Sequence, residues 1–165
     1  MPSVLPYILR FVAVLLLQVL LFNNLDFMGY LSPYIYLIFF LRLPVSFKTS
    51  YSMLLGFLMG LLVDIFANTM GVHTFACVLV CFVRNGWIGM LFSTLNAQQD
   101  EVSAVRVGWL DYFKYVVGLV LLHHTVLYML EAFTFFAFGY TLLRIVLNTV
   151  CTTGFVLCYE FLRSK

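Results

Sequence analysis

The side chains in this sequence that could do acid–base or metal chemistry are few, and most of them lie inside apolar runs. His73, Cys77 and Cys81 follow one another at intervals of four residues, so they share one face of a helix. The pair His123-His124 lies in a different apolar run. Histidines at membrane depth can bind metal or relay protons, but no carboxylate stands at a matching ligand spacing. The pattern therefore favours hydrogen-bonded histidines that pack helices together, and we predict no metal site.

Recognisable catalytic motifs are missing from the sequence. It has no phosphate-binding glycine loop, no Gly-x-Ser-x-Gly elbow, no His-Glu-x-x-His and no paired carboxylates within one apolar run. The formal charge of +2 is small and the basic residues are dispersed, which argues against a nucleic-acid surface. We therefore expect a protein that is not an enzyme and needs no cofactor.

The composition is that of a membrane protein, because 64% of the 165 residues are hydrophobic and only 10% are charged. A spanning helix needs about 20 apolar residues, so the chain has room for about six spans in a single domain and little else. The prediction is an all-α integral membrane bundle over residues 1–165. Its expected spans are approximately 4–22, 31–47, 50–67, 72–92, 112–136 and 140–162.

The distribution of Lys and Arg predicts how the bundle is oriented. Basic residues flank the second and fourth breaks and the C-terminus, whereas the first, third and fifth breaks hold none. Since basic residues are retained on the cytoplasmic side, both termini should be cytoplasmic. The one long polar stretch, 93–111, then falls on that side, either as a solvated connector or as a docking loop.

Four residues of the third predicted span form a stripe, because Ser52, Gly56, Gly60 and Asp64 recur at intervals of four. Small residues at this spacing let two helices approach closely in lipid. The second helix could belong to the same bundle or to another protein. The sequence leaves both alternatives open, and the stripe is a candidate groove for a partner helix.

Three charged residues have similar predicted depths near the outer surface. A carboxylate placed in hydrocarbon costs about 2.5 kcal/mol or more, so Asp64 should be paired or lie at the interface. Glu131 lies at a similar level, and Arg144 is the one basic residue on the wrong side of the charge pattern. We expect an outer polar cluster of Asp64, Glu131 and Arg144, with separate solvation of each residue as the alternative.

The third and fourth spans also carry a family resemblance. The sequence reads Gly-Phe-Leu-Met-Gly-Leu-Leu-Val-Asp over 56–64, then Met-Gly-Val-His-Thr over 70–74, with Arg84 closing the next helix and Pro33 opening the second span. This resembles MreD, the small membrane subunit of the bacterial rod-shape system, the elongasome. The family often has an acidic residue after that proline, where this chain has Tyr34. A role for that acid therefore does not carry over.

The resemblance implies a scaffold in the bacterial cytoplasmic (inner) membrane that regulates cell shape and peptidoglycan synthesis. Its expected partner is an MreC-like bitopic membrane protein, with RodA, a class B penicillin-binding protein and the MreB filament as further partners. The alternative is a substrate-binding subunit of an energy-coupling-type vitamin transporter. Asp64, His73, Glu131 and Arg144 would then line an outward-facing pocket.

Overall fold

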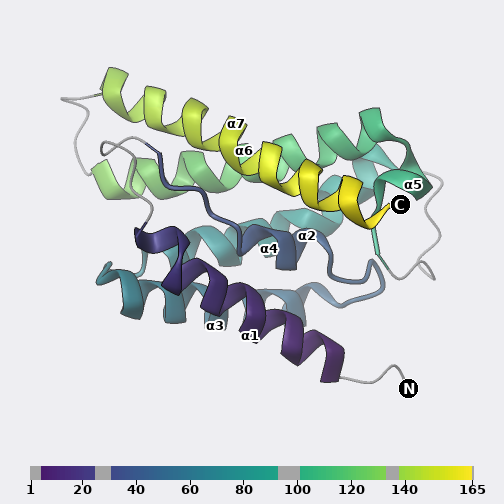
Figure 1. Ribbon diagram of the computed structural model, residues 1–165, viewed down its shortest axis with the longest axis horizontal. Coiled ribbons are helices and arrows are strands. Elements are labelled where there is room, and N and C mark those ends of the chain that lie inside the picture. Colours follow the sequence, from purple (N-terminus) through teal and green to yellow (C-terminus); the bar gives the residue numbers. More distant parts are fainter. Residues whose placement is uncertain (1–4, 25–30, 93–100, 133–137, 165) are drawn as a thin grey trace.

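The computed structural model describes residues 5–24, 31–92, 101–132 and 138–164, and the regular elements in these ranges are helices (Figure 1). The elements are α1 (Leu5–Leu20), η1 (Phe22–Asn24), α2 (Leu37–Leu41), α3 (Thr49–Ala67), α4 (Val72–Leu91), α5 (Ala104–Val107), α6 (Trp109–Ala132) and α7 (Phe138–Arg163). The all-α expectation is confirmed for these residues.

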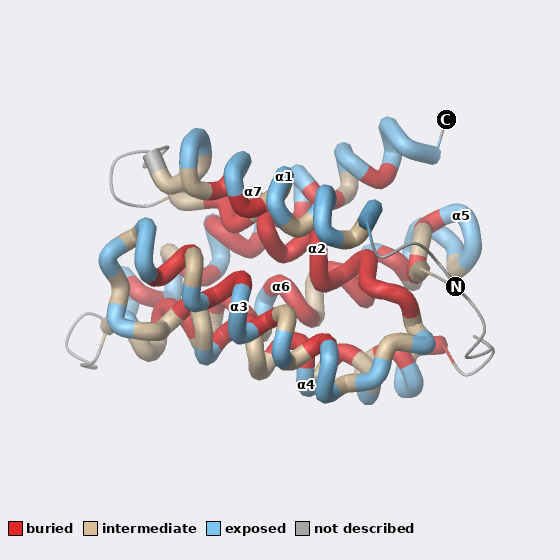
Figure 2. Tube along the Cα trace, turned by 90° about the horizontal axis from the view of Figure 1, so that it is seen from below, coloured by how far each residue is buried: buried red, intermediate tan, exposed pale blue. Residues whose placement is uncertain are grey.

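In the described ranges four helices, α3, α4, α6 and α7, are long and apolar enough to cross a membrane. They match four of the expected spans to within a few residues, and α1 is an apolar but shorter helix of 16 residues. Each of these five helices buries one side and exposes a second, largely apolar side (Figure 2). This distribution is typical of a bundle whose outer surface is covered by lipid, since water would not tolerate so many exposed apolar side chains.

The expected span over 31–47 is not a continuous helix. Within it only Leu37–Leu41 is α-helical, and the flanking residues are extended or form turns. Pro33 and Pro44 stand on either side of the short helix, and proline disfavours helical backbone in the residue before it. Figure 1 shows the segment running the length of the molecule between the α1–α3 side and the α6–α7 side.

The helix α1 begins and α7 ends at the same end of the molecule, which we call the terminal end (Figure 1). The opposite end is called the far end, and there α3 meets α4. The stretch predicted as a polar connector, 93–111, contains α5 and the start of α6, separated at Gly108 with φ +89°. Its residues 93–100 lie outside the described ranges.

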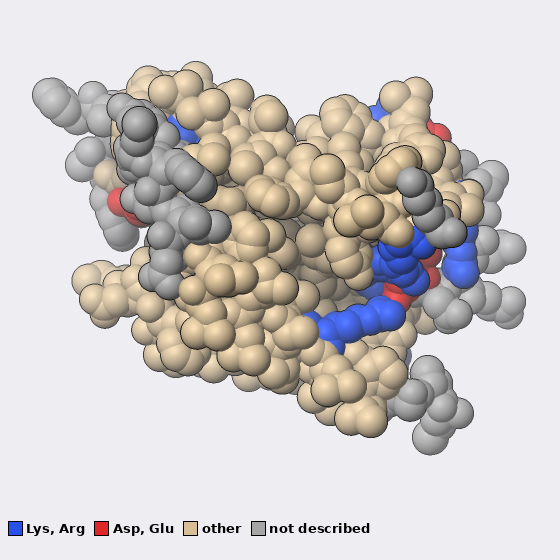
Figure 3. Space-filling view, viewed as in Figure 1, with Lys and Arg blue, Asp and Glu red and all other residues tan. Residues whose placement is uncertain are grey.

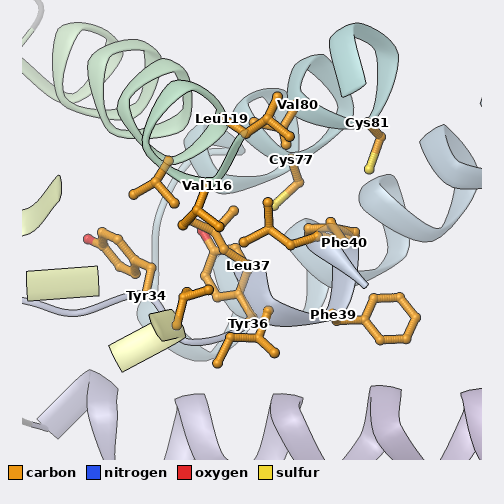
Figure 4. Packing of buried hydrophobic residues seen from close by; sticks show 14 of the residues in the cluster. Tyr34, Tyr36, Leu37, Phe39, Phe40, Cys77, Val80, Cys81, Val116 and Leu119 are labelled. Carbon is orange, nitrogen blue, oxygen red and sulfur yellow. The ribbon is translucent and has the colours of Figure 1, made fainter. Parts of the chain in front are cut away.

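The core is built around the irregular segment. All five residues of α2 are buried, together with Tyr34 and Tyr36 before it. Figure 4 shows Tyr36, Leu37 and Phe40 close to Cys77 and Val80 of α4 and to Val116 and Leu119 of α6. Because the apolar side chains of this segment fill the centre of the bundle, the long helices pack around it.

Candidate functional site

The small-residue stripe of α3 packs against α4 of the same chain. A Cβ added at Gly60 would lie 2.4 Å from the Thr74 Cα and 2.8 Å from the His73 carbonyl oxygen. A Cβ added at Gly56 would lie 2.9 Å from the Cys81 Sγ. The intramolecular alternative therefore holds in the structure. The stripe is not open to a helix of another protein, because α4 already fills it.

Asp64, at the end of this stripe, caps the start of α4. Its carboxylate is buried, with 3% of the residue exposed. It accepts hydrogen bonds from the backbone N–H groups of His73 (3.1 Å) and Thr74 (2.8 Å) and from the hydroxyls of Thr69 (2.5 Å) and Thr74 (2.6 Å). A carboxylate at a helix N-terminus satisfies free donors and complements the helix dipole.

Two left-handed residues bring Asp64 to this position. Asn68 ends α3 with φ 54°, and Gly71 precedes α4 with φ 84°. These are residue types that adopt left-handed backbone at low cost. The tight reversal returns the first turn of α4 to the last turns of α3, so one carboxylate reaches both amides.

The expected outer polar cluster forms only in part. The Arg144 guanidinium lies 3.2 Å from a carboxylate oxygen of Glu131 and stacks over the ring of Tyr128, 4.4 Å from its centroid. Among the described residues Asp64 makes no ion pair with Arg144. The cluster is therefore a Glu131–Arg144 pair between α6 and α7, and Asp64 serves the α3–α4 turn instead.

A polar pocket of about 360 Å³ opens at the far end beside this pair. Its walls come from the ends of α1, α3, α4, α6 and α7, and they include Tyr34, Thr69, His73, Glu131 and Arg144. Three of the four residues proposed for a transporter-type ligand pocket thus line one cavity. Asp64 is not among the lining residues.

The hydroxyl of Tyr36 bridges two of the histidines, His73 and His123. It lies 3.0 Å from His73 Nδ1 and 2.8 Å from His123 Nε2. The hydroxyl can donate to one ring nitrogen and accept from the other. The Cys77 Sγ lies 4.0 Å from His123 Nε2, while Cys81 packs on Gly56. In the described ranges no group of three His, Cys, Asp or Glu side chains could hold a metal ion.

The irregular segment is fixed at its first half by side chains from α1 and α7. The Gln18 carbonyl accepts the Ile35 N–H at 2.8 Å, and the Thr152 hydroxyl accepts the Tyr34 N–H at 3.2 Å. The amide oxygen of Asn148 accepts the Ser32 N–H at 2.7 Å. Asn148 and Thr152 of α7 thus bond across the bundle to this segment.

Arg84 and Tyr115 fix the second half of the segment. Arg84 is 0% exposed and donates to the carbonyl oxygens of Leu41 (3.4 Å) and Leu43 and to the Tyr115 hydroxyl (2.9 Å). The Tyr115 hydroxyl in turn donates to the Leu41 carbonyl oxygen at 3.0 Å. In the sequence Arg84 stood out as a basic residue near a span end and as part of the family resemblance. Its burial and its role were missed, because composition does not show which way a side chain points.

The terminal end carries an ion-pair network centred on Glu101. Arg10 of α1, Arg42 after α2 and Arg163 of α7 all contact its carboxylate, Arg10 at 2.6 Å and Arg163 at 3.3 Å. Burial raises the pKa of Glu101, but the hydrogen bonds and charges of Arg42 and Arg10 outweigh it, so the pKa lies below its usual value. Figure 3 shows these basic and acidic atoms gathered at one end of the molecule.

A second carboxylate, that of Glu160, supports this network from α7. One of its oxygens accepts the Ala104 N–H at 3.1 Å, and the other lies 3.6 Å from the Arg42 guanidinium. The network thereby joins the beginning of α1, the end of the irregular segment, the chain before α5 and the end of α7. These ion pairs and hydrogen bonds hold the four segments together at the terminal end.

The comparisons with known proteins add no relative. Comparison of the chain with protein-family models, with curated proteins and with solved structures found no match. The conclusions about this protein therefore come from its sequence and from the geometry above.

Proposed function

We propose that this chain is a non-enzymatic scaffold of the MreD type, a multi-pass protein of the bacterial cytoplasmic membrane. Its six crossings would place both termini in the cytoplasm. It would bind an MreC-like bitopic protein and thereby regulate cell shape and peptidoglycan synthesis by the elongasome. RodA, a class B penicillin-binding protein and the MreB filament would be further partners of the assembly.

The supporting observation is what the buried polar side chains do. Gln18, Asn148, Thr152, Arg84 and Tyr115 are bonded to the backbone of the irregular segment. Non-helical backbone is tolerated at membrane depth only where such partners satisfy it. These polar groups therefore have a structural role, and the function of the protein would depend on the outer surface of the bundle.

The partner's single helix needs a surface other than the α3 stripe. Gly86 and Gly89 lie exposed on α4, and a Cβ added at either would meet nothing within 4 Å. The large side chains of Phe82 and Met90 are exposed on the same helix, 59% and 75%. Small residues between large ones allow close approach of another helix, so we propose that the partner packs over Gly86 and Gly89.

The test is a pull-down of the tagged protein in mild detergent, with mass spectrometry of the bound proteins and small molecules. Wild type is compared with the double variant Gly86→Leu/Gly89→Leu and with Gly154→Leu. Gly154 is a matched control because it is an exposed helical glycine with open space, but on α7. We expect a single-span partner to be recovered with wild type and Gly154→Leu and lost with the double variant.

The outcomes separate the scaffold from its contact site. A partner lost only in Gly154→Leu would move the contact to α7. A partner that survives in both variants would refute the glycine contact. Recovery of no single-span protein from cells that make one would refute the scaffold. Equal melting temperatures of the three proteins show that the variants fold, as the open space around each glycine leads us to expect.

A ligand-binding subunit is the second candidate, and the far-end pocket with His73, Glu131 and Arg144 favours it. Such a subunit should copurify with a stoichiometric small molecule. Adding that molecule should raise the melting temperature of wild type but not of Arg144→Gln. A wild-type protein that carries no small molecule and does not respond to a vitamin panel would exclude this candidate.

A further inference from the structure

The terminal end holds a pocket whose lining includes basic and aromatic side chains. It has a volume of about 440 Å³, and it is lined by Tyr7, Pro44, Ser46, Phe47, Glu101, Ser103, Arg106 and Arg163. These residues come from α1, from the chain after α2, from α5 and its approach, and from the end of α7. The proposed scaffold function assigns nothing to this pocket.

The charge of the pocket and its surroundings is positive. Arg10, Arg42 and Arg163 share the single carboxylate of Glu101, with Glu160 close to Arg42. Arg106 is exposed in the pocket wall, and its guanidinium has no ion-pair partner among the described residues. Among the described residues of this end, four guanidinium groups therefore stand against two carboxylates, which leaves a site suited to an anion.

The carboxylate of Glu101 does not cancel this preference. Three arginines cover it, and its side chain is only 14% exposed. One of its oxygens is bonded by Arg10 and the other by Arg42 and Arg163. Its charge is thus neutralised within the network, while Arg106 and Arg163 both line the pocket and are themselves exposed.

An apolar groove adjoins the basic pocket. It has a volume of about 370 Å³ and is lined by Tyr7, Ile8, Phe11, Phe39, Phe47, Leu55 and Leu58. Tyr7 and Phe47 belong to both linings, so they form the boundary between the two spaces. The groove lies on the apolar surface between α1 and α3, where lipid chains would be the solvent.

We propose that the basic pocket and the apolar groove together bind one anionic phospholipid. Arg106 and Arg163 hold its phosphate, with the hydroxyls of Ser46 and Ser103 as additional donors. One acyl chain passes Tyr7 and Phe47 and lies in the groove. Basic pockets between transmembrane helices recognise anionic headgroups in this way, and arginine suits phosphate because its donors are fixed in a plane.

Two features favour a phospholipid over a free phosphate compound. The polar and apolar spaces adjoin at Tyr7 and Phe47, which matches an amphipathic molecule. The neighbours of Arg106 and Arg163 in the sequence are exposed and apolar: Val105 and Leu162 are 70% and 74% exposed. This pocket therefore lies at the border between headgroups and hydrocarbon, where long basic side chains settle in membranes.

The test is native mass spectrometry of the full-length protein, titrated in neutral detergent with phosphatidylglycerol or phosphatidylcholine. We expect one retained phosphatidylglycerol per chain and at least about tenfold weaker retention of phosphatidylcholine. The double variant Arg106→Gln/Arg163→Gln should weaken phosphatidylglycerol binding by about tenfold or more. The matched control is Lys48→Gln/Lys114→Gln, which removes the same charge from exposed positions outside the pocket.

A third variant, Leu55→Trp, fills the groove. It should weaken the binding of phosphatidylglycerol and leave the binding of glycerol 3-phosphate unchanged. Equal affinity for the two phospholipids would overturn the proposal. So would equal losses in the pocket and control variants. Glycerol 3-phosphate binding as tightly as the phospholipid would show an anion site without a role for the groove. The melting temperature of each variant shows whether it still folds. We expect both arginine substitutions to be tolerated, because Arg106 and Arg163 are exposed.

Discussion

Replacing Gly60 by alanine should separate α3 from α4. The new Cβ would lie 2.4 Å from the Thr74 Cα and 2.7 Å from its nitrogen, whereas ordinary contacts begin at 3.4 Å. Both neighbours are backbone atoms that no rotamer change can remove. The two helices must therefore move apart by about 1 Å at this level, because overpacked cores yield through backbone shifts.

The shift would also reach the Asp64 cap. The carboxylate contacts to the His73 and Thr74 amides, 3.1 and 2.8 Å, would stretch beyond the limit of a good hydrogen bond. Overpacking costs about 3 kcal/mol and the loss of a cap about 1 kcal/mol, while alanine returns about 1 kcal/mol of helix propensity. The net loss of about 3 kcal/mol lowers the folding equilibrium constant more than a hundredfold.

The assay is unfolding in mixed micelles, followed by the helical circular dichroism signal during titration with a denaturing detergent. Gly56→Ala should be less destabilising, because its Cβ would meet the movable Cys81 Sγ first, at 2.9 Å. Gly86→Ala is the control, since its Cβ meets nothing within 4 Å. A Gly60→Ala protein as stable as Gly86→Ala would refute the packing of α3 on α4 described above.

Three further predictions concern the polar groups. Asp64→Asn should speed hydrogen exchange at the His73 or the Thr74 amide by about tenfold, with no change in the middle of α4. The two amides donate to different carboxylate oxygens, and the asparagine nitrogen that replaces one oxygen cannot accept a hydrogen bond. Arg84→Lys should lower the free energy of unfolding by about 2 kcal/mol, because one ammonium group cannot bond the Leu41 and Leu43 carbonyls and Tyr115 together. The control Arg106→Lys, at an exposed position, should leave that free energy unchanged. Since the folded-state pKa of Glu101 is lowered, its stabilisation is complete above its unfolded pKa of about 4.3 and is lost as the pH falls through the lower folded value. The melting temperature of wild type should therefore drop more steeply between about pH 5 and about pH 3 than that of Glu101→Gln, and parallel curves would contradict the network.

The sequence by itself predicted a lipid environment for this protein and most of its helices. Apolar runs of nearly 20 residues have few stable structures in lipid other than helices, so α3, α4, α6 and α7 follow from composition and run length. The stripe that contains Gly56 and Gly60 likewise predicted a close contact between two helices.

Only the tertiary structure decided which partner each of these groups has. The stripe meets α4 because the Asn68 and Gly71 turn brings that helix back, which spacing alone could not tell. The segment 31–47 was predicted as a helix, since apolarity does not distinguish a helix from a buried irregular chain. It departs from a helix because Gln18, Arg84 and other side chains, distant in sequence, satisfy its backbone. Such compensation between remote residues exists only once the bundle is assembled.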